Sequence, residues 1–310
     1  DKEFLAELAT DHLEAGLIRE WRQIAKILSN YIYSTPTIRP KFRPVGAITG
    51  RPTGEEGVQT FARGHGVRES YLSARGCFVA GDLSQVELRT GAIFSRDTKL
   101  GHIYRTNGDV HTYTCRDIIG EPTKENRNRA KPVNFSLVYG GGAEMLRVIA
   151  LTQYNVRFTS AEAAGYRAAW FHNYPGIGNW HVENIREALS TGGIRSKLGQ
   201  WFPLGKVYSK DRGIQQEAYR HAHNYQNQGA GNILGLICLR EAAKLDWDAP
   251  VLYYHDAVYN QNHPNDADEF AYQWRKNCHQ AMDEFWPPED RENIPLILDV
   301  KKQRTIAEEK

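Results

Sequence analysis

Two aspartates, each close to a short apolar stretch, are the residues of this chain best suited to metal chemistry. Asp82 follows the apolar run 77–80, and Asp256 lies inside PVLYYHDAVYNQ, residues 250–261. A carboxylate at the end of a strand, beside the start of a helix, is well placed to hold a divalent cation. Each aspartate also has a purely structural explanation, because aspartate is common at helix caps and in turns.

The stretch KENRNRAKPVNFSLVYGGG, residues 124–142, places two cations and two aromatic rings at a spacing of four: Arg127, Lys131, Phe135 and Tyr139. Each step of four along a helix turns about 40°, so the four side chains share a face about 120° wide. Such a face suits a polyphosphate at one end and a stacked ring at the other. The structural alternative is an aromatic pair in the core with solvated basic residues.

Pro132 is in conflict with a regular helix through this stretch. It removes the hydrogen bond to the Asn128 carbonyl, at a cost of about 3 kcal/mol. The sequence therefore predicts either a kink at Pro132 or a helix whose regular part starts there. The glycines at 140–142 are expected to end the helix.

Three elements must position these side chains. The run 77–80 predicts a buried strand with Asp82 at its end. Ser84 followed by Glu87 matches a capping box, so a helix is expected to start at Ser84. The stretch 250–261 predicts a β-hairpin with Asp256 at its turn.

The rest of the chain is largely helical in pattern. Residues 1–34 carry one apolar stripe, formed by Leu17, Trp21, Ile24, Leu28 and Tyr31, with Arg22 and Lys26 beside it. A helix is expected near Asp109, helices over 143–190 with an aromatic turn at 170–180, a hairpin over 195–203, and a long helix from Gln215. The basic side chains beside the stripe could face a phosphate backbone or simply solvent.

The segment 39–75 is rich in prolines and basic residues. It holds seven Arg or Lys against three Glu, with the glycine-rich TGRPTG at 49–54. Backbone without side chains can approach a ligand closely here, which suits contacts to phosphates. A solvent-exposed basic loop explains the same composition.

Composition narrows the class of protein. The chain has 310 residues, enough for about two domains or one multi-lobed unit, and a net charge of only +2. Its four cysteines are scattered without a CxxC spacing, which argues against a zinc site or a disulfide framework. No stretch approaches 18 consecutive apolar residues. These features favour a soluble protein of a reducing, cytoplasmic compartment.

Together, the three stretches resemble the polymerase motifs of the DNA polymerase I family (family A). GDLSQVELR is similar to the first motif, RNRAKPVNFSLVYG to the fingers helix, and YYHDAVY to the third motif. Further blocks match in order: REWRQIAKILSNYI, TGRPT, GVQTF, GDVHT and NYQNQGAGNI. The resemblance implies an α+β right-hand polymerase fold, with an antiparallel β palm, helical fingers and a truncated thumb. It implies a thumb-base helix at 1–34, palm at 35–107 and 211–310, and fingers at 108–210.

The resemblance implies a nucleotidyltransferase, a DNA-directed DNA polymerase that needs two Mg²⁺ ions, for which Mn²⁺ could substitute. Asp82, Asp256 and the Leu83 carbonyl would hold the metals, and Lys131 would be a candidate acid for the leaving group. Two carboxylates this close would resist joint ionisation without cations between them.

The resemblance also assigns residues to the two substrates. Incoming nucleotide would be bound by Glu87, as a steric gate against a ribose 2′-hydroxyl, and by Gln85, His111, Arg127, Lys131, Phe135 and Tyr139. Primer–template DNA would be contacted by Arg51, Gln59, Arg220, Asn224, Gln228 and His255. Arg22 and Lys26 are added from their place beside the apolar stripe.

Several positions depart from the family pattern. Ala257 stands where the family usually has Glu, Leu83 replaces a Tyr, and Ser136 replaces a Gly. GQWF at 199–202 stands where an arginine-rich turn is expected. The chain also begins partway through the thumb, so our preferred interpretation is one half of a split polymerase, as in some phages. A separate polypeptide would then carry the thumb and the 3′–5′ exonuclease.

Two other functions are kept open. A single-subunit RNA polymerase shares the two aspartates and a fingers helix, although Glu87 and Phe135 favour deoxynucleotides. A non-catalytic, DNA-binding subunit with a degenerate polymerase fold is suggested by Ala257, Pro132 and the missing thumb.

Overall fold

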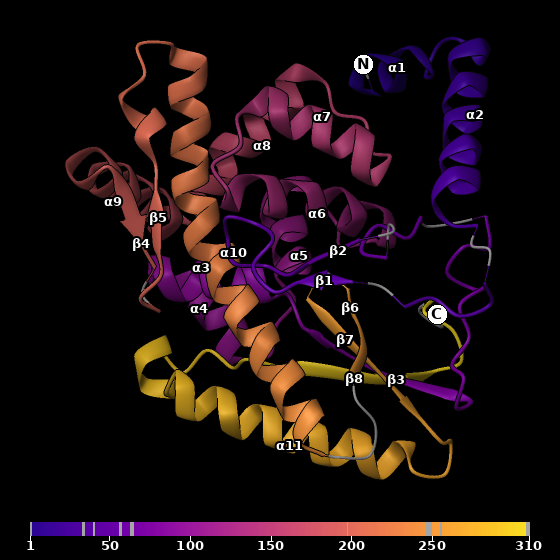
Figure 1. Cartoon of the computed structure of the whole chain (residues 1–310). Coiled ribbons are helices and arrows are strands. Elements are labelled where there is room, and N and C mark those ends of the chain that lie inside the picture. The colour runs from indigo at the N-terminus through magenta and orange to yellow at the C-terminus, as the bar shows by residue number, and fades with distance from the viewer. Residues whose placement is uncertain are drawn as a thin grey trace. The chain divides into compact units, whose positions relative to one another are not determined.

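A four-stranded antiparallel sheet in the order β6-β7-β3-β8 carries both aspartates of the sequence motifs (Figure 1). Its strands are β3 (Cys77–Leu83), β6 (Pro250–Tyr254), β7 (Ala257–Asn262) and β8 (Leu298–Gln303). The computed structural model describes residues 2–32, 35–39, 41–55, 58–62, 65–196, 198–245, 250–254 and 256–307, and leaves the side chains of residues 2 and 3 undescribed.

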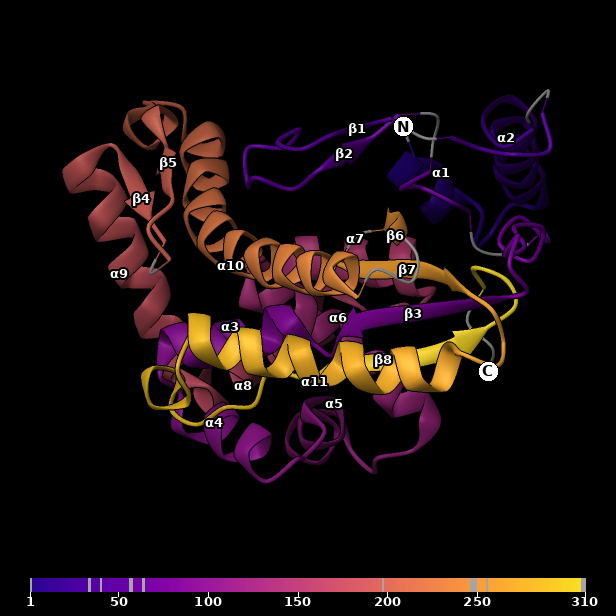
Figure 2. The ribbon, with the colours of Figure 1, turned by 60° about the horizontal axis from the view of Figure 1, so that its bottom comes forward.

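One face of the sheet packs against helices, since side chains alternate along each strand. Helix α11 (Ala267–Phe285) runs along this face (Figure 2). The buried Trp274 reaches Gly81 of β3 and donates its ring N–H to the Cys238 carbonyl at 2.9 Å. Tyr253 of β6 lies on the same side, against Gly235. Glycine at both positions leaves room for an aromatic ring against the backbone.

The opposite face of the sheet differs between its two ends. At one end, Phe78 and Tyr259 join a buried cluster with Tyr31, Phe61 and Ile306. At the other end of the same face, Asp82 is exposed to solvent. The sheet therefore offers an acidic, open end beside a covered, apolar one.

The chain consists of two compact units. Unit 1 comprises residues 1–19, 87–230 and 288–295, and unit 2 comprises 20–86, 231–287 and 296–310. Unit 2 holds the sheet, α11 and the short hairpin of β1 (Phe42–Arg43) and β2 (Thr53–Gly54). Helices α2 (Leu13–Asn30), α3 (Val86–Ser95) and α10 (Arg212–Lys244) cross the division. The predicted domain boundaries at 34, 107 and 210 remain predictions.

Unit 1 is helical around a core that includes the fully buried Trp170, Tyr174, Leu137 and Ile177. Its helices are α1 (Lys2–Leu8), α4 (Thr98–Arg105), α5 (Val110–Thr114), a π-helical turn (Cys115–Ile119), α6 (Lys124–Val138), α7 (Ala143–Tyr154), α8 (Ser160–Asn173) and α9 (Pro175–Thr191). A hairpin of β4 (Gly193–Arg195) and β5 (Trp201–Pro203) follows, and two 3₁₀ turns lie at Gly205–Tyr208 and Pro288–Arg291. The fold is thus a mixture of helices and antiparallel sheet, as predicted.

The first predicted strand and helix differ from the observed ones by a few residues. Strand β3 continues to Leu83, because residues 78–83 all pair with β8, so Asp82 lies inside the strand. Helix α3 begins at Val86 and not at Ser84, since Gln85 has a positive φ of 48°. The Ser84 amide instead donates to the Ile297 carbonyl at 2.9 Å.

The sequence predicts one helix over residues 1–34, with a single apolar stripe. This region instead forms two helices, α1 and α2, and Tyr31 lies just beyond the end of α2. Tyr31 is buried, but the rest of the stripe is exposed, with Trp21 at 68% of its full accessibility. The stripe therefore stays uncovered within the described part of the chain.

The structure of helix α6 decides whether the regular helix starts only at Pro132. The regular helix begins at Lys124, where the Thr123 side chain accepts the Asn126 amide, and continues through Pro132 to Val138. The expectation that regular helix starts only at Pro132 is wrong. The predicted hairpins at 195–203 and 250–261, the helix start at Asp109 and the helix end at Gly140 are confirmed.

None of the helices among the described residues combines the length and the apolarity needed to cross a membrane.

Replacing Gly81 by Ala should destabilise the sheet. The added Cβ would lie 2.4 Å from the Trp274 ring, so one of the two must move. Overpacking of this kind costs about 1–3 kcal/mol, measurable by urea unfolding. Gly165→Ala in α8 is the control, because no heavy atom lies within 4 Å of its Cβ and a stabilisation of about 0.5–1 kcal/mol is expected. An unchanged midpoint for Gly81→Ala would contradict the packing described.

Candidate active site

The strand register brings the two motif aspartates together within unit 2. Asp82 of β3 pairs with Ala257 of β7, the residue directly after Asp256. On its other side, Asp82 pairs with Asp299 of β8. Directly paired residues point to the same face, with Cβ atoms about 4.5–5.5 Å apart. Two carboxylates thus flank each other at 82 and 299, with a third at the neighbouring turn.

Asp256 is held by a cation from the TGRPTG loop. Nη2 of Arg51 lies 3.0 Å from Oδ1 and 3.2 Å from Oδ2 of Asp256. Both side chains are largely buried, at 21% and 17% exposed. A buried charge is costly unless it is paired. A guanidinium therefore provides the positive charge that this carboxylate requires.

Gln59 fastens the loop that carries Arg51. Its Oε1 accepts the Gly54 amide at 2.7 Å, and its Nε2 donates to the carbonyls of Pro52 and Tyr253 at 3.1 and 3.2 Å. The side-chain amide thus links the loop to strand β6 and aims Arg51 at the sheet. The predicted contact of Gln59 with DNA would have to share these atoms.

The oxygen donors at this end of the sheet fit a small, hard cation. Described residues contain no cluster of three or more Asp, Glu, His or Cys arranged to hold a metal. Mg²⁺ does not need one, because it is usually bound by one or two carboxylates with substrate phosphates and water. The exposed Asp82 and the neighbouring Asp256 are such a pair. The Leu83 carbonyl belongs to the same strand end, where Leu83 pairs with Leu298.

In unit 1, Asp109 holds the first cation of α6. Its carboxylate accepts Nε of Arg127 at 2.8 Å and Nη2 at 3.2 Å, and it also caps α5 through the Thr112 amide at 3.0 Å. Partial burial favours the protonated acid, but the hydrogen bonds from Arg127 and Thr112 prevail and hold the pKa of Asp109 well below its ordinary value. Arg127 is therefore oriented before any ligand arrives.

His111 is a neutral hydrogen-bond donor. Asn134 accepts the Trp170 ring N–H at 2.8 Å and the Thr114 hydroxyl at 2.9 Å through Oδ1, so its amide must donate to Nδ1 of His111 at 3.0 Å. Nε2 then carries the imidazole proton. Burial lowers the pKa of His111 to about 4, with Asp109 opposing the shift and Arg127 adding to it.

The remaining residues of the α6 face are partly exposed. Lys131 makes no ion pair within the described chain, and its neighbour Phe135 lies 5.6 Å from the His111 ring. Tyr139 caps the end of the helix. The face presents, in order, a paired guanidinium, an ammonium and two rings.

Glu87 lies near the start of α3 and is fixed through its backbone. The buried Asn227 of α10 donates to the Glu87 carbonyl at 2.8 Å and accepts the hydroxyl of Thr90. Three side chains on α10, each partly exposed, lie four residues apart: Arg220, Asn224 and Gln228.

Some predicted residues lie elsewhere or beyond description. Arg22 and Lys26 are exposed on α2, and Gln85 is partly exposed at the turn before α3. His255 falls outside the described residues. The sequence patterns missed three residues: Asn227, Asp299, and Asp109 in its role as the partner of Arg127. The GDVHT block indicated Asp109 only as a helix cap. Asn227 and Asp299 act through contacts between residues far apart in sequence, which local patterns do not indicate.

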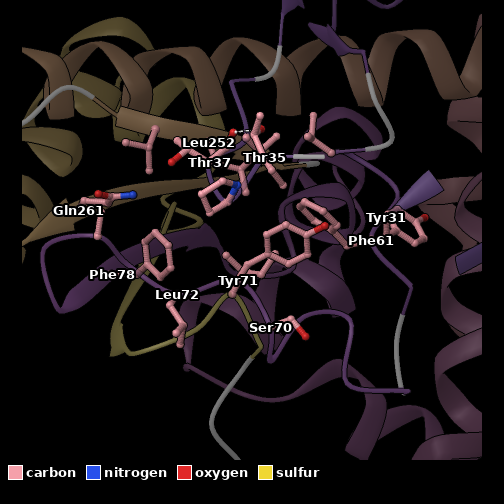
Figure 3. Close-up of a pocket in the computed structure, with 16 residues that line it drawn as sticks. Tyr31, Thr35, Thr37, Phe61, Ser70, Tyr71, Leu72, Phe78, Leu252 and Gln261 are labelled. Atoms are coloured by element: carbon pink, nitrogen blue, oxygen red, sulfur yellow. Dashed lines mark hydrogen bonds between the residues drawn. The ribbon is translucent and has the colours of Figure 1, made fainter. Parts of the chain in front are cut away.

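A cavity of about 430 Å³ lies in unit 2, at the apolar end of the sheet face that carries Asp82. Tyr31, Phe61, Tyr71, Phe78 and Leu252 line it, with the Gln261 amide at one side (Figure 3). Neither motif aspartate belongs to its lining.

Comparison with known protein families identifies the family to which this chain belongs. The profile of DNA polymerase family A matches residues 1–307. The chain belongs to that family. DNA polymerase I of Aquifex aeolicus is 31% identical over 67% of this chain and 35% of its own length, and that of Pseudomonas aeruginosa is 28% identical over 73% and 26%. The chain thus spans about a third or less of these family A relatives.

A solved structure shares the fold. The POL domain of Pol1 from M. smegmatis, in complex with DNA primer-template and dNTP, matches 95% of this chain with a TM-score of 0.78. The match covers 52% of that chain at 23% sequence identity. This likeness supports the α+β assignment of the polymerase fold.

Two substitutions at Asp109 should separate its two roles. Asn keeps an oxygen for the Thr112 amide but loses the charge that Arg127 binds, and we expect a loss of up to about 1 kcal/mol for this partly solvated pair. Ala also removes the helix cap, which costs about 1 kcal/mol more. Chemical unfolding of both variants measures the difference. Equal midpoints would show that the cap contributes nothing.

Proposed function

We propose that this chain is a template-directed DNA polymerase that adds deoxynucleotides to a primer 3′ end. The observation that supports it best is the register that sets Asp82 beside the Asp256 turn, on an open sheet face. Family membership adds to this support. Within this proposal, Asp82 and Asp256 are the catalytic carboxylates.

Two Mg²⁺ ions would be held by Asp82, Asp256 and the Leu83 carbonyl, with Mn²⁺ as a substitute. When bound, such ions acidify the primer hydroxyl and offset charge on the triphosphate. The chain's own contribution is to hold the two carboxylates close together. Arg51 supports this, because it already neutralises Asp256 at 3.0 Å.

The α6 face is proposed to bind the incoming triphosphate. Arg127 would reach the phosphates while Asp109 fixes its plane, and the neutral His111 would donate from Nε2. Lys131 would donate a proton to the leaving pyrophosphate, since an ammonium is a compact donor on a flexible stem. Phe135 would lie against the sugar and base, and Tyr139 near the templating base.

Discrimination and DNA contacts complete the proposal. Glu87, with Gln85 nearby in sequence, would exclude a ribose 2′-hydroxyl, and the Asn227 bond to its carbonyl would fix the gate. Primer–template DNA, present in the M. smegmatis complex, would be contacted here by Arg51, Gln59, Arg220, Asn224, Gln228, His255, Arg22 and Lys26. Of the alternatives, the RNA polymerase and the non-catalytic subunit are both less favoured by the family A match.

Primer extension with Mg²⁺ tests the central claim. Asp256→Asn should lower the rate by about 10³-fold or more, because several kcal/mol of charge stabilisation is lost. Asp268→Asn, on the exposed side of α11, should extend primers like the parent chain. Deoxynucleotides should be preferred over ribonucleotides. Extension by Asp256→Asn at the parent rate would reject the proposal.

We also propose that the exposed stripe of α2 is covered by a further segment carrying the thumb and exonuclease, on this or a separate polypeptide. Leu17, Trp21, Ile24 and Leu28 form a seam with the 3–4 spacing of helix pairs. Left uncovered, such a seam favours self-association.

Sedimentation velocity measures this tendency. The 310-residue chain should self-associate with rising concentration, and Leu17→Glu with Leu28→Glu should shift it toward the monomer. Arg19→Gln with Lys26→Gln serves as the control. A parent chain that stays monomeric at high concentration would remove the support for a docking face.

A further inference from the structure

At the C-terminal turn of α6, the Val138 carbonyl is hydrogen-bonded from outside the helix. The Gly141 amide donates to the Ser136 carbonyl and the Gly140 amide to the Leu137 carbonyl, each at 3.0 Å. Gly140 has a φ of 74°. These are the two bonds of a Schellman motif. The Val138 carbonyl lies at the last helical position, directly before Tyr139, and takes no part in them.

His181 of α9 supplies the missing bond. Its Nε2 lies 2.9 Å from the Val138 oxygen, and a carbonyl only accepts, so Nε2 must carry the proton. The imidazole is 7% exposed. The end of α6 is thus tied to α9 by a histidine of defined tautomer.

His223 of α10 stacks on this histidine. The ring centroids are 4.0 Å apart with 20° between the planes, and His223 is 3% exposed. Nδ2 of the buried Asn184 lies 3.5 Å from Nδ1 of His223, which therefore accepts. Trp180 and Phe171 pack against the stack.

Gly140 rests on the two imidazoles. A Cβ at this position would lie 2.9 Å from Cδ2 of His223 and 3.7 Å from Cε1 of His181. The stack therefore holds the helix end from two sides, at the Val138 carbonyl and at Gly140. Tyr139 is the residue between these two points, so its direction depends on both.

The charges that face the stack do not favour a protonated imidazole. Arg167 of α8 donates to the Gly141 carbonyl at 3.3 Å, and its charge acts on His181, while each imidazole also faces the other. Burial lowers the pKa of His181 to about 4, only partly opposed by the bond to Val138, and lowers that of His223 well below its ordinary value.

We propose that the stacked pair His181–His223 is a positioning element for Tyr139, and that it makes nucleotide selection by α6 sensitive to acid. The proposal rests on the proposed polymerase function for its kinetic consequence. The structural part stands on the contacts alone. A proton on either ring would place a charge against the other imidazole, and a proton on His181 would also face the charge of Arg167.

The direction of the pH effect follows from the lowered pKa values. Between pH 6.5 and about 4 the unfolded chain binds protons that the folded stack does not. The stabilisation by the pair is therefore complete above pH 6.5 and is lost as the pH falls toward 4. His111 of α5 adds a similar dependence, which single variants of the pair leave unchanged.

Three variants and one control decide the proposal. His181→Phe keeps a stacking ring but loses the donor to Val138, and His181→Gln restores an amide donor. His223→Phe removes the second titrating group. His172→Gln, exposed on α8, is the matched control. Urea midpoints from pH 4.5 to 8 and the kcat and KM for dNTP in primer extension are measured on each.

His181→Phe should raise the KM for dNTP about 5- to 10-fold, the effect of one hydrogen bond, with a smaller change in kcat. His181→Gln should recover most of it. His223→Phe should lose less stability than the parent between pH 6.5 and 5. A KM for His181→Phe equal to that of His172→Gln would overturn the kinetic claim, and a parent pH dependence retained by His223→Phe would overturn the structural one.

Failure of the polymerase assignment would look different. A parent chain that does not extend primers rejects that assignment, while the pH dependence of unfolding still decides whether the stack is a titrating support.

Discussion

The pairing of β3 with β7 and β8 is the constraint on which the acidic site depends. A slip of one residue would turn Asp82 toward α11 and the buried Trp274. Gly81 works against such a slip, because it accepts the Trp274 ring, which a side chain at this position would displace. Like charges paired across strands are unfavourable, and Asp82 faces Asp299 directly. The sheet thus fixes carboxylates where their own repulsion opposes them, and Arg51 offsets part of that charge at Asp256.

In unit 1, hydrogen bonds and not strand register hold the polar side chains in position. Asn134 and Asp109 use up their own hydrogen-bonding capacity to fix His111 as a neutral donor and Arg127 as an oriented cation. The donors at the α6 face are therefore oriented by Asn134 and Asp109, which are not part of that face. A neutral imidazole beside a permanent cation gives two donors of different character on one surface.

Local patterns predicted much of this and long-range contacts escaped them. The hairpin around Asp256 and the helix end at Gly140 were predictable, because turn chemistry acts over a few residues. The start of α3 was missed because Gln85 takes a positive φ that no motif indicates, and β8 pairing extended β3 past Asp82. The bond from Arg51 to Asp256 joins residues far apart in sequence, so their spacing gave no sign of it. The uncovered stripe on α2 had the periodicity of a packed helix, and periodicity alone does not tell which partner covers it.

Pro132 has a further consequence for the mechanics of α6. Proline has no amide hydrogen, so the Asn128 carbonyl lacks its usual partner midway along the helix, where Asn128 is solvent-exposed. Helix α6 is therefore least stiff between the half that carries Arg127 and Lys131 and the half that carries the two aromatic rings. Bending there would let the two halves follow different parts of a ligand, and water would solvate the released oxygen at little cost. A residue that weakens the helix thermodynamically thus gives it compliance at its centre.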